Sequence, residues 1–299
     1  MTDPASPART ADEPVALAPT LSTTLGYLLH RSFQLVERVF VEELRDIAHP
    51  KDLTLVSRLL AAGPQAQHDL ALTLGVNRSV MVHRLDALEQ AGLATRTRNP
   101  ADRRSQVIAA TPHGAVTLEA AGPRYRAADA KLTSRLDATQ RQRLYALLGD
   151  LLGPSLPEVL APVSESVGFR ITRAHFALHA RADAKLEPLG LEVREYGLLA
   201  TARDIGPCSQ QQIAHLHDVS GPVIVELVDT LEGKGLILRE RNPSDRRSYA
   251  LRLTPAGETT LARAMAGMAD LDKDVAAQVG IENRDELYGL LRALLGAPI

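Results

Sequence analysis

The sequence contains no tryptophan, few other aromatic residues and one cysteine, Cys208. A single cysteine excludes an internal disulfide and fits a reducing compartment. No uninterrupted apolar run reaches membrane-spanning length, and the N-terminus has no apolar signal-peptide core. We therefore expect a soluble, cytoplasmic protein with no membrane partner, whose cores consist mainly of leucine, alanine and valine.

Motifs of catalytic chemistry are also missing. The sequence shows no nucleophile–base–acid grouping, no glycine-rich phosphate loop and no paired carboxylates. We therefore expect no enzymatic activity and no cofactor. The Cys208 thiol is expected to be inert, because one thiol could pair only with an outside partner. Residues 1–19 are rich in Pro, Ala and Thr, which predicts a disordered tail.

One seven-residue segment occurs twice. Residues 99–105, NPADRRS, return as residues 242–248, NPSDRRS, and the same offset of 143 positions relates Gly92 to Gly235 and Thr111 to Thr254. A fixed offset without insertions indicates two copies of one module. We expect repeat 1 over residues 20–152, a linker over 153–162 and repeat 2 over 163–299.

The linker and the charge balance describe how the repeats relate. The linker has three prolines and is short, and extended chain spans only about 3.3–3.6 Å per residue. Residues 20–152 carry 17 Lys/Arg against 13 Asp/Glu, whereas residues 163–295 carry 16 against 19. The repeats therefore share a pattern but not an electrostatic character.

Each repeat begins with apolar residues at helical spacing. In repeat 1, apolar residues at three- and four-residue steps predict helices at 25–40, 53–62, 65–74 and 78–91. The last two are separated only by Gly75-Val76-Asn77, which is typical of a helix-turn-helix. Gly92 is expected to cap the second helix in the left-handed conformation.

After Gly92 the sequence period changes from 3.6 residues, which is helical, to 2, which is typical of strands. This predicts a β-hairpin with residues 99–105 at its turn. Thr111 is a predicted N-cap with Pro112 in the first helical position, and Gly122-Pro123 should kink the helix that follows. A closing helix runs from Asp137 to 152. Repeat 2 predicts the same order, with helices at 163–186, 192–202, 209–217 and 222–233, a hairpin at 236–253, and closing helices to 295.

Four motifs follow one another at fixed spacing in repeat 1. They are Leu74-Gly75-Val76-Asn77-Arg78-Ser79, Leu88-Glu89-x-x-Gly92-Leu93, Asp102-Arg103-Arg104-Ser105 and Thr111-Pro112-x-Gly114. Their order and spacing resemble the MarR family of winged-helix transcriptional regulators. The resemblance covers almost all of each repeat. It implies a mainly α fold with small β-hairpin wings, arranged as two tandem winged helix-turn-helix modules.

The family resemblance also implies an assembly and a function. Family members usually act as homodimers with interleaved first and last helices, so this chain resembles two protomers fused end to end. It implies an interleaved helical pseudo-dimer interface within one chain, which we expect to be monomeric. It further implies a repressor of transcription that binds double-stranded DNA and responds to a small phenolic or aromatic effector. That effector would bind in a cleft between the helical and winged-helix lobes.

Arginines dominate the predicted wings. Arginines at the hairpin turns suit a narrow minor groove, whose negative potential attracts guanidinium groups; they are Arg103, Arg104, Arg246 and Arg247. Asp102 and Asp245 are predicted to orient these arginines. Strand arginines suit phosphate contacts, and they are Arg96, Arg98, Arg239 and Arg241. The plainer alternative is a solvated basic turn with weak exposed ion pairs.

The two predicted recognition helices differ. Repeat 1 offers groups able to contact phosphates or base edges, and they are Asn77, Arg78, Ser79, His83 and Arg84. At the matching places repeat 2 offers Ser220, Gly221, Pro222, Val223 and Glu226. Either repeat 2 reads a different half-site through methyl contacts and one carboxylate-to-cytosine bond, or it docks mainly through its wing. Both interpretations predict an imperfectly palindromic operator.

Candidate effector residues lie on the helices that wall the cleft in the family. They are His30, Arg31, Phe33, His175, Phe176, His179 and Tyr196. Differences between the repeats predict two unequal pockets, of which either both or only one would be functional. His175 and His179 also have a spacing that could ligate a metal, but no carboxylate or cysteine cluster completes such a site, so we expect no metal. The alternatives are a metal-responsive sensor, or a ligand-binding or protein-interaction module whose second repeat has lost DNA binding.

Overall fold

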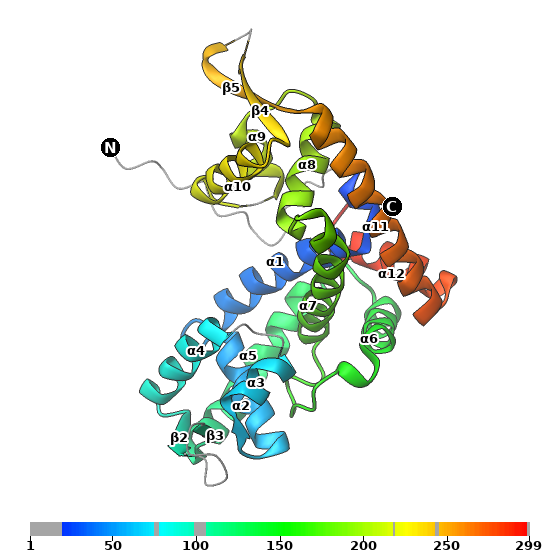
Figure 1. Cartoon of the computed structure of the whole chain (residues 1–299). Helices are drawn as coiled ribbons and strands as arrows, with labels where there is room; N and C mark the ends of the chain where they lie inside the picture. The colour runs from blue at the N-terminus through cyan, green and yellow to red at the C-terminus, as the bar shows by residue number, and fades with distance from the viewer. Residues whose placement is uncertain (1–19, 75–77, 99–105, 218, 243–244, 298–299) are drawn as a thin grey trace. The chain divides into compact units, whose positions relative to one another are not determined.

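A computed structural model describes residues 20–74, 78–98, 106–217, 219–242 and 245–297. These residues are mainly helical with two small antiparallel sheets (Figure 1). They form two compact units: unit 1 contains the described residues of 31–177 and 290–297, and unit 2 contains those of 20–30 and 178–289. None of the helices described combines the length and hydropathy needed to cross a membrane.

Two long helices divide between the units. Helix α1 (Leu25–Leu44) begins in unit 2 and ends in unit 1, whereas α7 (Val167–Leu186) begins in unit 1 and ends in unit 2. Each unit therefore combines the winged-helix elements of one repeat with a helical segment of the other.

Unit 1 contains the helix-turn-helix and hairpin of repeat 1. Its further helices are α2 (Pro50–Ala62), α3 (Gln67–Leu74), α4 (Arg78–Gln90), α5 (Pro112–Leu132) and α6 (Ala138–Leu152). Its sheet has the order β1-β3-β2, with β1 (Gln65–Ala66), β2 (Ala94–Arg98) and β3 (Gln106–Ala110). The predicted order of helices and hairpin is confirmed, but Gln65 and Ala66, predicted as the start of a helix, instead form strand β1 because they pair with β3. Helix α5 continues as one helix through Pro123. A short 3₁₀ turn, η2 (Gly153–Ser155), follows α6.

Unit 2 repeats this order. Its elements are η1 (Leu21–Thr23), η3 (Glu187–Leu189), α8 (Val193–Ile205), α9 (Gln210–His217), α10 (Gly221–Gly233), β4 (Ile237–Asn242), β5 (Asp245–Leu253) and α11 (Pro255–Val279). Helix α12 (Ile281–Leu294) belongs to unit 2 as far as Gly289, and its last residues belong to unit 1. One hydrophobic cluster joins α8, α9, α10, the hairpin and α11 through buried side chains such as Leu199, Ile213, Val228 and Leu261. The recognition helix and the hairpin therefore rest on a common core.

The Thr-Pro-x-Gly motif connects the hairpin to the helix that follows it. Thr111 Oγ1 accepts a hydrogen bond from Gly114 N at 2.9 Å and donates one to Gly92 O at 2.6 Å. A Cβ at Gly114 would overlap the carbonyl oxygen of Leu93, so glycine is required by the close approach. Thr254, Gly257 and Gly235 repeat these contacts in unit 2. The motif is therefore a structural clamp in both repeats.

Cys208 has a structural position in the sheet of unit 2. Its amide and carbonyl pair with Leu251 of β5, at distances of 3.4 Å and 2.7 Å. The corresponding pair in unit 1 is Gln65 and Ile108. The side chain is buried, and burial raises the pKa of the thiol to about 11. The reactive thiolate is therefore disfavoured at neutral pH.

Candidate nucleic-acid interface and ligand cavity

Helix α4 presents a small polar and apolar surface in unit 1. Ser79, Val80 and His83 are exposed, whereas Arg84 turns toward α2. Its Nη1 lies 3.6 Å from Asp52 Oδ1 and its Nη2 lies 3.4 Å from His49 Nε2. The exposed residues fit the predicted DNA surface, while Arg84 contacts the neighbouring helix in this state.

Burial and neighbouring cations change the protonation of this group. Burial, then the charges of Arg84 and Lys51, lower the pKa of His49 to about 4, so the imidazole is neutral at pH 7. Burial raises the pKa of Asp52, and the Arg84 guanidinium opposes that shift. His49 Nδ1 also accepts a hydrogen bond from Lys51 N at 3.2 Å and thereby caps α2. The three side chains join the start of α2 to the recognition helix.

Arg96 of β2 is also directed at the recognition helix. Its guanidinium lies 2.5 Å from Asp86 and 3.1 Å from Glu89, and both carboxylates belong to α4. The equivalent Arg239 of β4 pairs with Asp229 and Glu232 of α10. A DNA phosphate would compete with two carboxylates for each arginine. The predicted phosphate contacts of Arg96 and Arg239 remain predictions, and the exposed Arg98 is the freer candidate on β2.

Helix α10 has a different exposed face. Ser220 at its N-cap is exposed, as are Val223, Val225 and Glu226. Leu227, at the position of Arg84 in repeat 1, is buried. The described surface of α10 is therefore apolar and acidic where α4 offers hydroxyl and imidazole groups. The divergence predicted for the two helices is visible in their exposed side chains.

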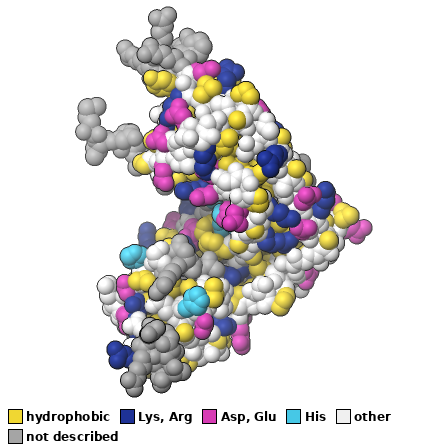
Figure 2. All heavy atoms as spheres, in the orientation of Figure 1, with side chains coloured by type: hydrophobic (Ala, Val, Ile, Leu, Met, Phe, Trp, Pro, Cys, Tyr) yellow, Lys and Arg dark blue, Asp and Glu magenta, His cyan; other side chains and the backbone are white. Residues whose placement is uncertain are grey.

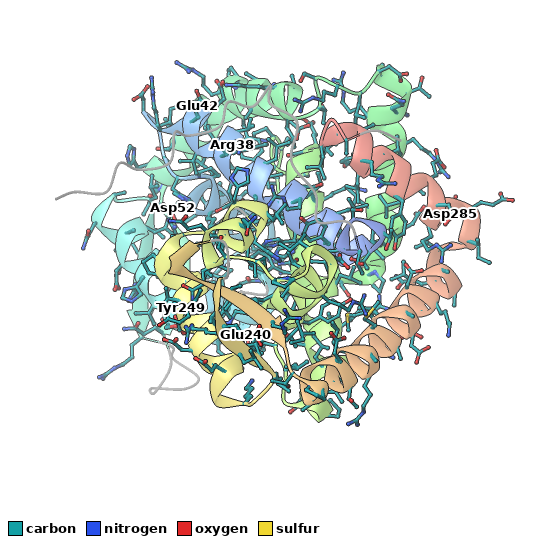
Figure 3. The ribbon with its side chains drawn as sticks, turned by 90° about the horizontal axis from the view of Figure 1, so that it is seen from above. Arg38, Glu42, Asp52, Glu240, Tyr249 and Asp285 are labelled. Carbon is teal, nitrogen blue, oxygen red and sulfur yellow. The ribbon has the colours of Figure 1, made fainter. Side chains whose placement is uncertain are left out.

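The hairpin of unit 2 carries one group that the sequence did not single out. Tyr249 of β5 is 53% exposed and lies opposite Arg241 in the strand register (Figure 3). On the same hairpin, Arg252 Nε lies 3.0 Å from Glu240 of β4. An exposed aromatic ring on a wing is a candidate contact for the sugar–phosphate surface. Only its exposure identifies it, because repeat 1 has Gln106 at this position.

Several predicted DNA contacts lie outside the described residues. They are Asn77, Asp102, Arg103 and Arg104, together with the side chains of Arg78, Arg241, Asp245, Arg246 and Arg247. On the face shown in Figure 2, basic and acidic side chains are interspersed over the part of the chain that is described. The predicted roles of the turn arginines therefore remain predictions.

Unit 2 contains a cavity of about 510 Å³. Its wall is formed by η1 and the first turns of α1, the second half of α7, helices α8, α10 and α11, and Tyr288 of α12. Most of the lining is apolar, and Leu178, Ile224 and Met268 are examples. Three residues of the recognition helix contribute to it, namely Val223, Ile224 and Leu227. A molecule in the cavity would therefore contact the inner face of α10.

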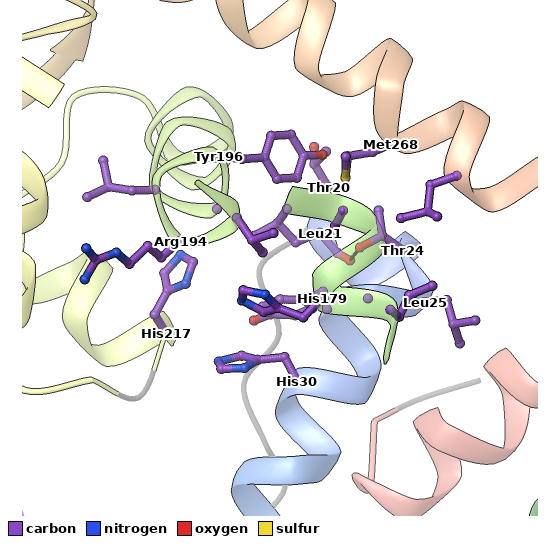
Figure 4. A pocket seen from close by; sticks show the side chains of 18 of the residues that line it. Thr20, Leu21, Thr24, Leu25, His30, His179, Arg194, Tyr196, His217 and Met268 are labelled. Atoms are coloured by element: carbon purple, nitrogen blue, oxygen red, sulfur yellow. Dashed lines mark hydrogen bonds between the residues drawn. The ribbon is translucent and has the colours of Figure 1, made fainter. Parts of the chain in front are cut away.

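Polar groups in the cavity are few and fixed by neighbours. His30, His179 and His217 line the same space, as does Arg194 (Figure 4). His217 Nε2 is 2.8 Å from Thr201 Oγ1, and His179 Nδ1 is 3.0 Å from Asp183 Oδ2. This combination of an apolar wall and a few oriented nitrogen groups suits a small amphipathic ligand.

The predicted effector residues separate into two groups. His30, His179 and Tyr196 line the cavity of unit 2, and burial raises the pKa of Tyr196 to about 12. The others belong to unit 1, where Phe33 stacks on His175 with ring centroids 4.6 Å apart and meets Phe176 edge-on at 5.4 Å. Arg31 is also buried in unit 1. The sequence did not indicate Thr24, Arg194, His217 or Tyr288, because their contribution depends on how separate elements meet.

The histidine pair offers no visible metal site. His175 stacks on Phe33, whereas His179 pairs with Asp183. Among the residues that the structure describes, no group of three His, Cys, Asp or Glu side chains is placed to hold a metal ion. The metal-sensor alternative gains no support from this part of the chain.

Comparison with known proteins identifies the family. The MarR family model matches residues 50–106 and 191–249, one segment in each repeat. A putative transcriptional regulatory protein for the hcr operon of Thauera aromatica is 37% identical over 131 residues, which cover 43% of this chain and 78% of that protein. The chain belongs to the MarR family.

Other relatives of this MarR protein are also regulators. The HTH-type transcriptional regulator YwoH of Bacillus subtilis is 27% identical over 115 residues, covering 38% of this chain and 83% of that protein. Among solved structures, the repressor CouR bound to a 23-mer DNA duplex is 34% identical, with a TM-score of 0.42. The match covers 45% of this chain and 96% of that one. CouR from Rhodococcus jostii RHA1 bound to p-coumaroyl-CoA is 25% identical, with a TM-score of 0.42 and coverage of 47% and 99%.

Proposed function

We propose that this MarR-family regulator binds double-stranded operator DNA and that a small ligand in the unit 2 cavity changes its grip. The observation that carries the proposal is the shared wall: Val223, Ile224 and Leu227 of the recognition helix α10 line the cavity. A ligand that fills the cavity would contact α10, which is the helix that would enter the major groove. Binding energy in the cavity is thereby coupled to the position of α10.

The lining favours an aromatic or phenolic ligand. Leu21, Leu25 and Leu178 supply apolar contact for a ring, while His30 and His217 supply hydrogen-bonding groups. Arg194 also lines the cavity, and its Nε pairs with Glu192 Oε2 at 2.6 Å, so an anionic or phenolic substituent would compete with that carboxylate for it. The regulatory output that follows most simply is repression, released when the ligand binds.

The assembly proposed is one chain acting as a pseudo-dimer. Both helix-turn-helix units are present in one polypeptide. Recognition helices about 34 Å apart would match successive major grooves. Light scattering should then give the mass of one chain in the absence of DNA. A stable mass of two chains would mean that the repeats pair between molecules.

The distinctive alternative is a binding module whose second repeat no longer contacts DNA. The exposed apolar and acidic face of α10, with Val223, Val225 and Glu226, favours it. Titration of the chain with fluorescent DNA taken from beside its own gene distinguishes the two. Specific, steeply salt-dependent binding that small aromatic acids release supports the regulator. Ligand binding without any preference for that DNA supports the module.

A further inference from the structure

The two units fill equivalent positions differently. Across the 143-residue offset, His30 and Met268, which line the cavity of unit 2, correspond to Arg173 and Tyr125 in unit 1. Arg173 and Tyr125 are 8% and 3% exposed, so both larger side chains lie inside unit 1. The region that is open to a ligand in unit 2 therefore contains the protein's own side chains in unit 1.

Arg173 joins helix α7 to the helix-turn-helix of unit 1. Its Nη2 donates to the carbonyl oxygen of Thr73 at 3.1 Å, and its Nη1 donates to that of Leu74. These carbonyls end α3, directly before the turn that leads to the recognition helix. A cation at a helix C-terminus is stabilised by the helix dipole and by otherwise unpaired carbonyls. The side chain thus latches the helix-turn-helix to α7.

Tyr125 closes the same region from α5. Its ring meets Phe40 of α1 edge-on, with centroids 5.0 Å apart. Phe40 is in turn so close to Gly168 of α7 that a Cβ on this glycine would lie 2.8 Å from the phenylalanine ring. The aromatic pair and α7 therefore leave no space for even one added methyl group at this point.

A carboxylate clamp shows the same difference. In unit 1, Asp129 Oδ1 accepts directly from Gly168 N at 2.9 Å and from Ser166 Oγ at 2.7 Å. The contact ties α5 to the beginning of α7 without an intervening group. The offset relates Asp129 to Asp272 and Gly168 to Leu25 in unit 2.

In unit 2 a tyrosine hydroxyl is inserted into the clamp. Tyr288 Oη accepts from Leu25 N at 2.9 Å and donates to Asp272 Oδ1 at 2.7 Å. Its counterpart in unit 1, Tyr145, instead donates to Ser164 O at 2.7 Å. The connection from α11 to α1 in unit 2 therefore passes through the Tyr288 hydroxyl in two hydrogen bonds, whereas α5 contacts α7 directly in unit 1. The cavity lies beside this connection, and Leu25, Asp272 and Tyr288 all line it.

We propose that ligand control in this chain is one-sided: one effector binds per chain, in unit 2, and Arg173 with the direct Asp129 clamp holds unit 1 in a single state. The proposal rests on the proposed function, because it assigns the ligand response to one of the two helix-turn-helix units. Helix α10 would respond to the effector, while α4 would remain a fixed anchor on its half-site.

Calorimetric titration of the full chain with 8-anilinonaphthalene-1-sulfonate, an amphipathic aromatic anion, tests the stoichiometry. One equivalent per chain is expected, with slower hydrogen exchange in α9–α10 and unchanged exchange in α3–α4. Two equivalents, or equal protection of both helix-turn-helix units, would overturn the one-sided proposal and leave the proposed function standing. No binding at all would overturn this proposal together with the ligand part of the proposed function, while specific DNA binding would remain measurable.

A matched exchange of residues identifies the latch. His30→Arg should weaken binding of the probe at least about tenfold, since it introduces the larger side chain into the cavity. Arg173→His should leave that site intact, increase exchange in α3–α4 and add a second, weaker equivalent. A folded Arg173→His chain with unchanged stoichiometry and exchange would contradict the latch. If this variant does not fold, the stoichiometry and exchange of the unmodified chain still decide the proposal.

Discussion

The Arg96 guanidinium lies 2.5 Å from the Asp86 carboxylate, so strand β2 is fastened to the recognition helix α4. The same arrangement returns 143 residues later between Arg239 and Asp229. The contact ties the first strand of the hairpin to the recognition helix. Both repeats retain it even though their recognition helices differ.

Replacement of Arg96 separates bracing from phosphate contact. If Arg96 only braces the hairpin, Arg96→Met should weaken DNA binding by the value of a partly exposed ion pair, about 0.2–1 kcal/mol. The slope of log affinity against log salt should stay unchanged. Arg98→Met is the control, since loss of one phosphate contact lowers that slope by about 0.9. Fluorescence anisotropy over a salt series gives both values, and a reduced slope for Arg96→Met would show that it binds phosphate in the complex.

Glu226→Gln tests how repeat 2 contacts DNA. Glu226 is exposed on α10 at the position of His83 in α4. If repeat 2 docks mainly through its wing, removal of the negative charge should tighten DNA binding severalfold, because the carboxylate repels phosphate. If Glu226 accepts a hydrogen bond from cytosine, the same change should cost about 1–3 kcal/mol of discrimination at one base pair. Competition with single-base operator variants distinguishes these results.

The protonation of His49 predicts a pH dependence of stability. Its pKa falls from 6.5 to about 4 on folding, so the unfolded chain binds the proton more tightly. The contribution of neutral His49 is therefore complete above pH 6.5 and is lost as the pH falls toward 4. The raised pKa of Asp52 acts in the opposite direction and offsets part of the loss.

His49→Asn isolates this contribution, since asparagine retains an acceptor for the N-cap of α2. The free energy of unfolding, measured with urea at about pH 7 and about pH 5, should depend less on pH in the variant than in the parent. An equal pH dependence in both proteins would assign the effect to other groups.

Much of the architecture could be predicted from the sequence. The 143-residue offset fixes the two repeats, and Thr111 with Gly114 marks the helix that follows each hairpin, because local backbone chemistry requires both residues. Glycines at the left-handed caps, such as Gly92, are equally local signals. These features depend on neighbours in the sequence, which a pattern records directly.

The candidate sites were predicted less completely, because they depend on contacts between distant elements. The sequence predicts that Arg96 binds a phosphate, but the fold places two carboxylates of α4 beside its guanidinium. The role of Tyr288 requires Leu25, which lies 263 positions away. Phe33 and His175 carry suitable chemistry for a pocket, but they pack against each other in unit 1. Spacing in the sequence does not indicate contacts between residues that are far apart along the chain.

We expect both wings of the chain to insert an arginine into the minor groove of the operator. The most direct measurement is anisotropy with operator DNA for the parent, for Arg104→Ala and Arg247→Ala singly, and for the double variant. Because a narrow minor groove attracts guanidinium groups, the double variant should lose specific binding and each single variant should lose part of it. An unfolding midpoint equal to that of the parent would confirm that the fold is intact. A folded double variant that bound the operator as tightly as the parent would contradict DNA binding through the two wings.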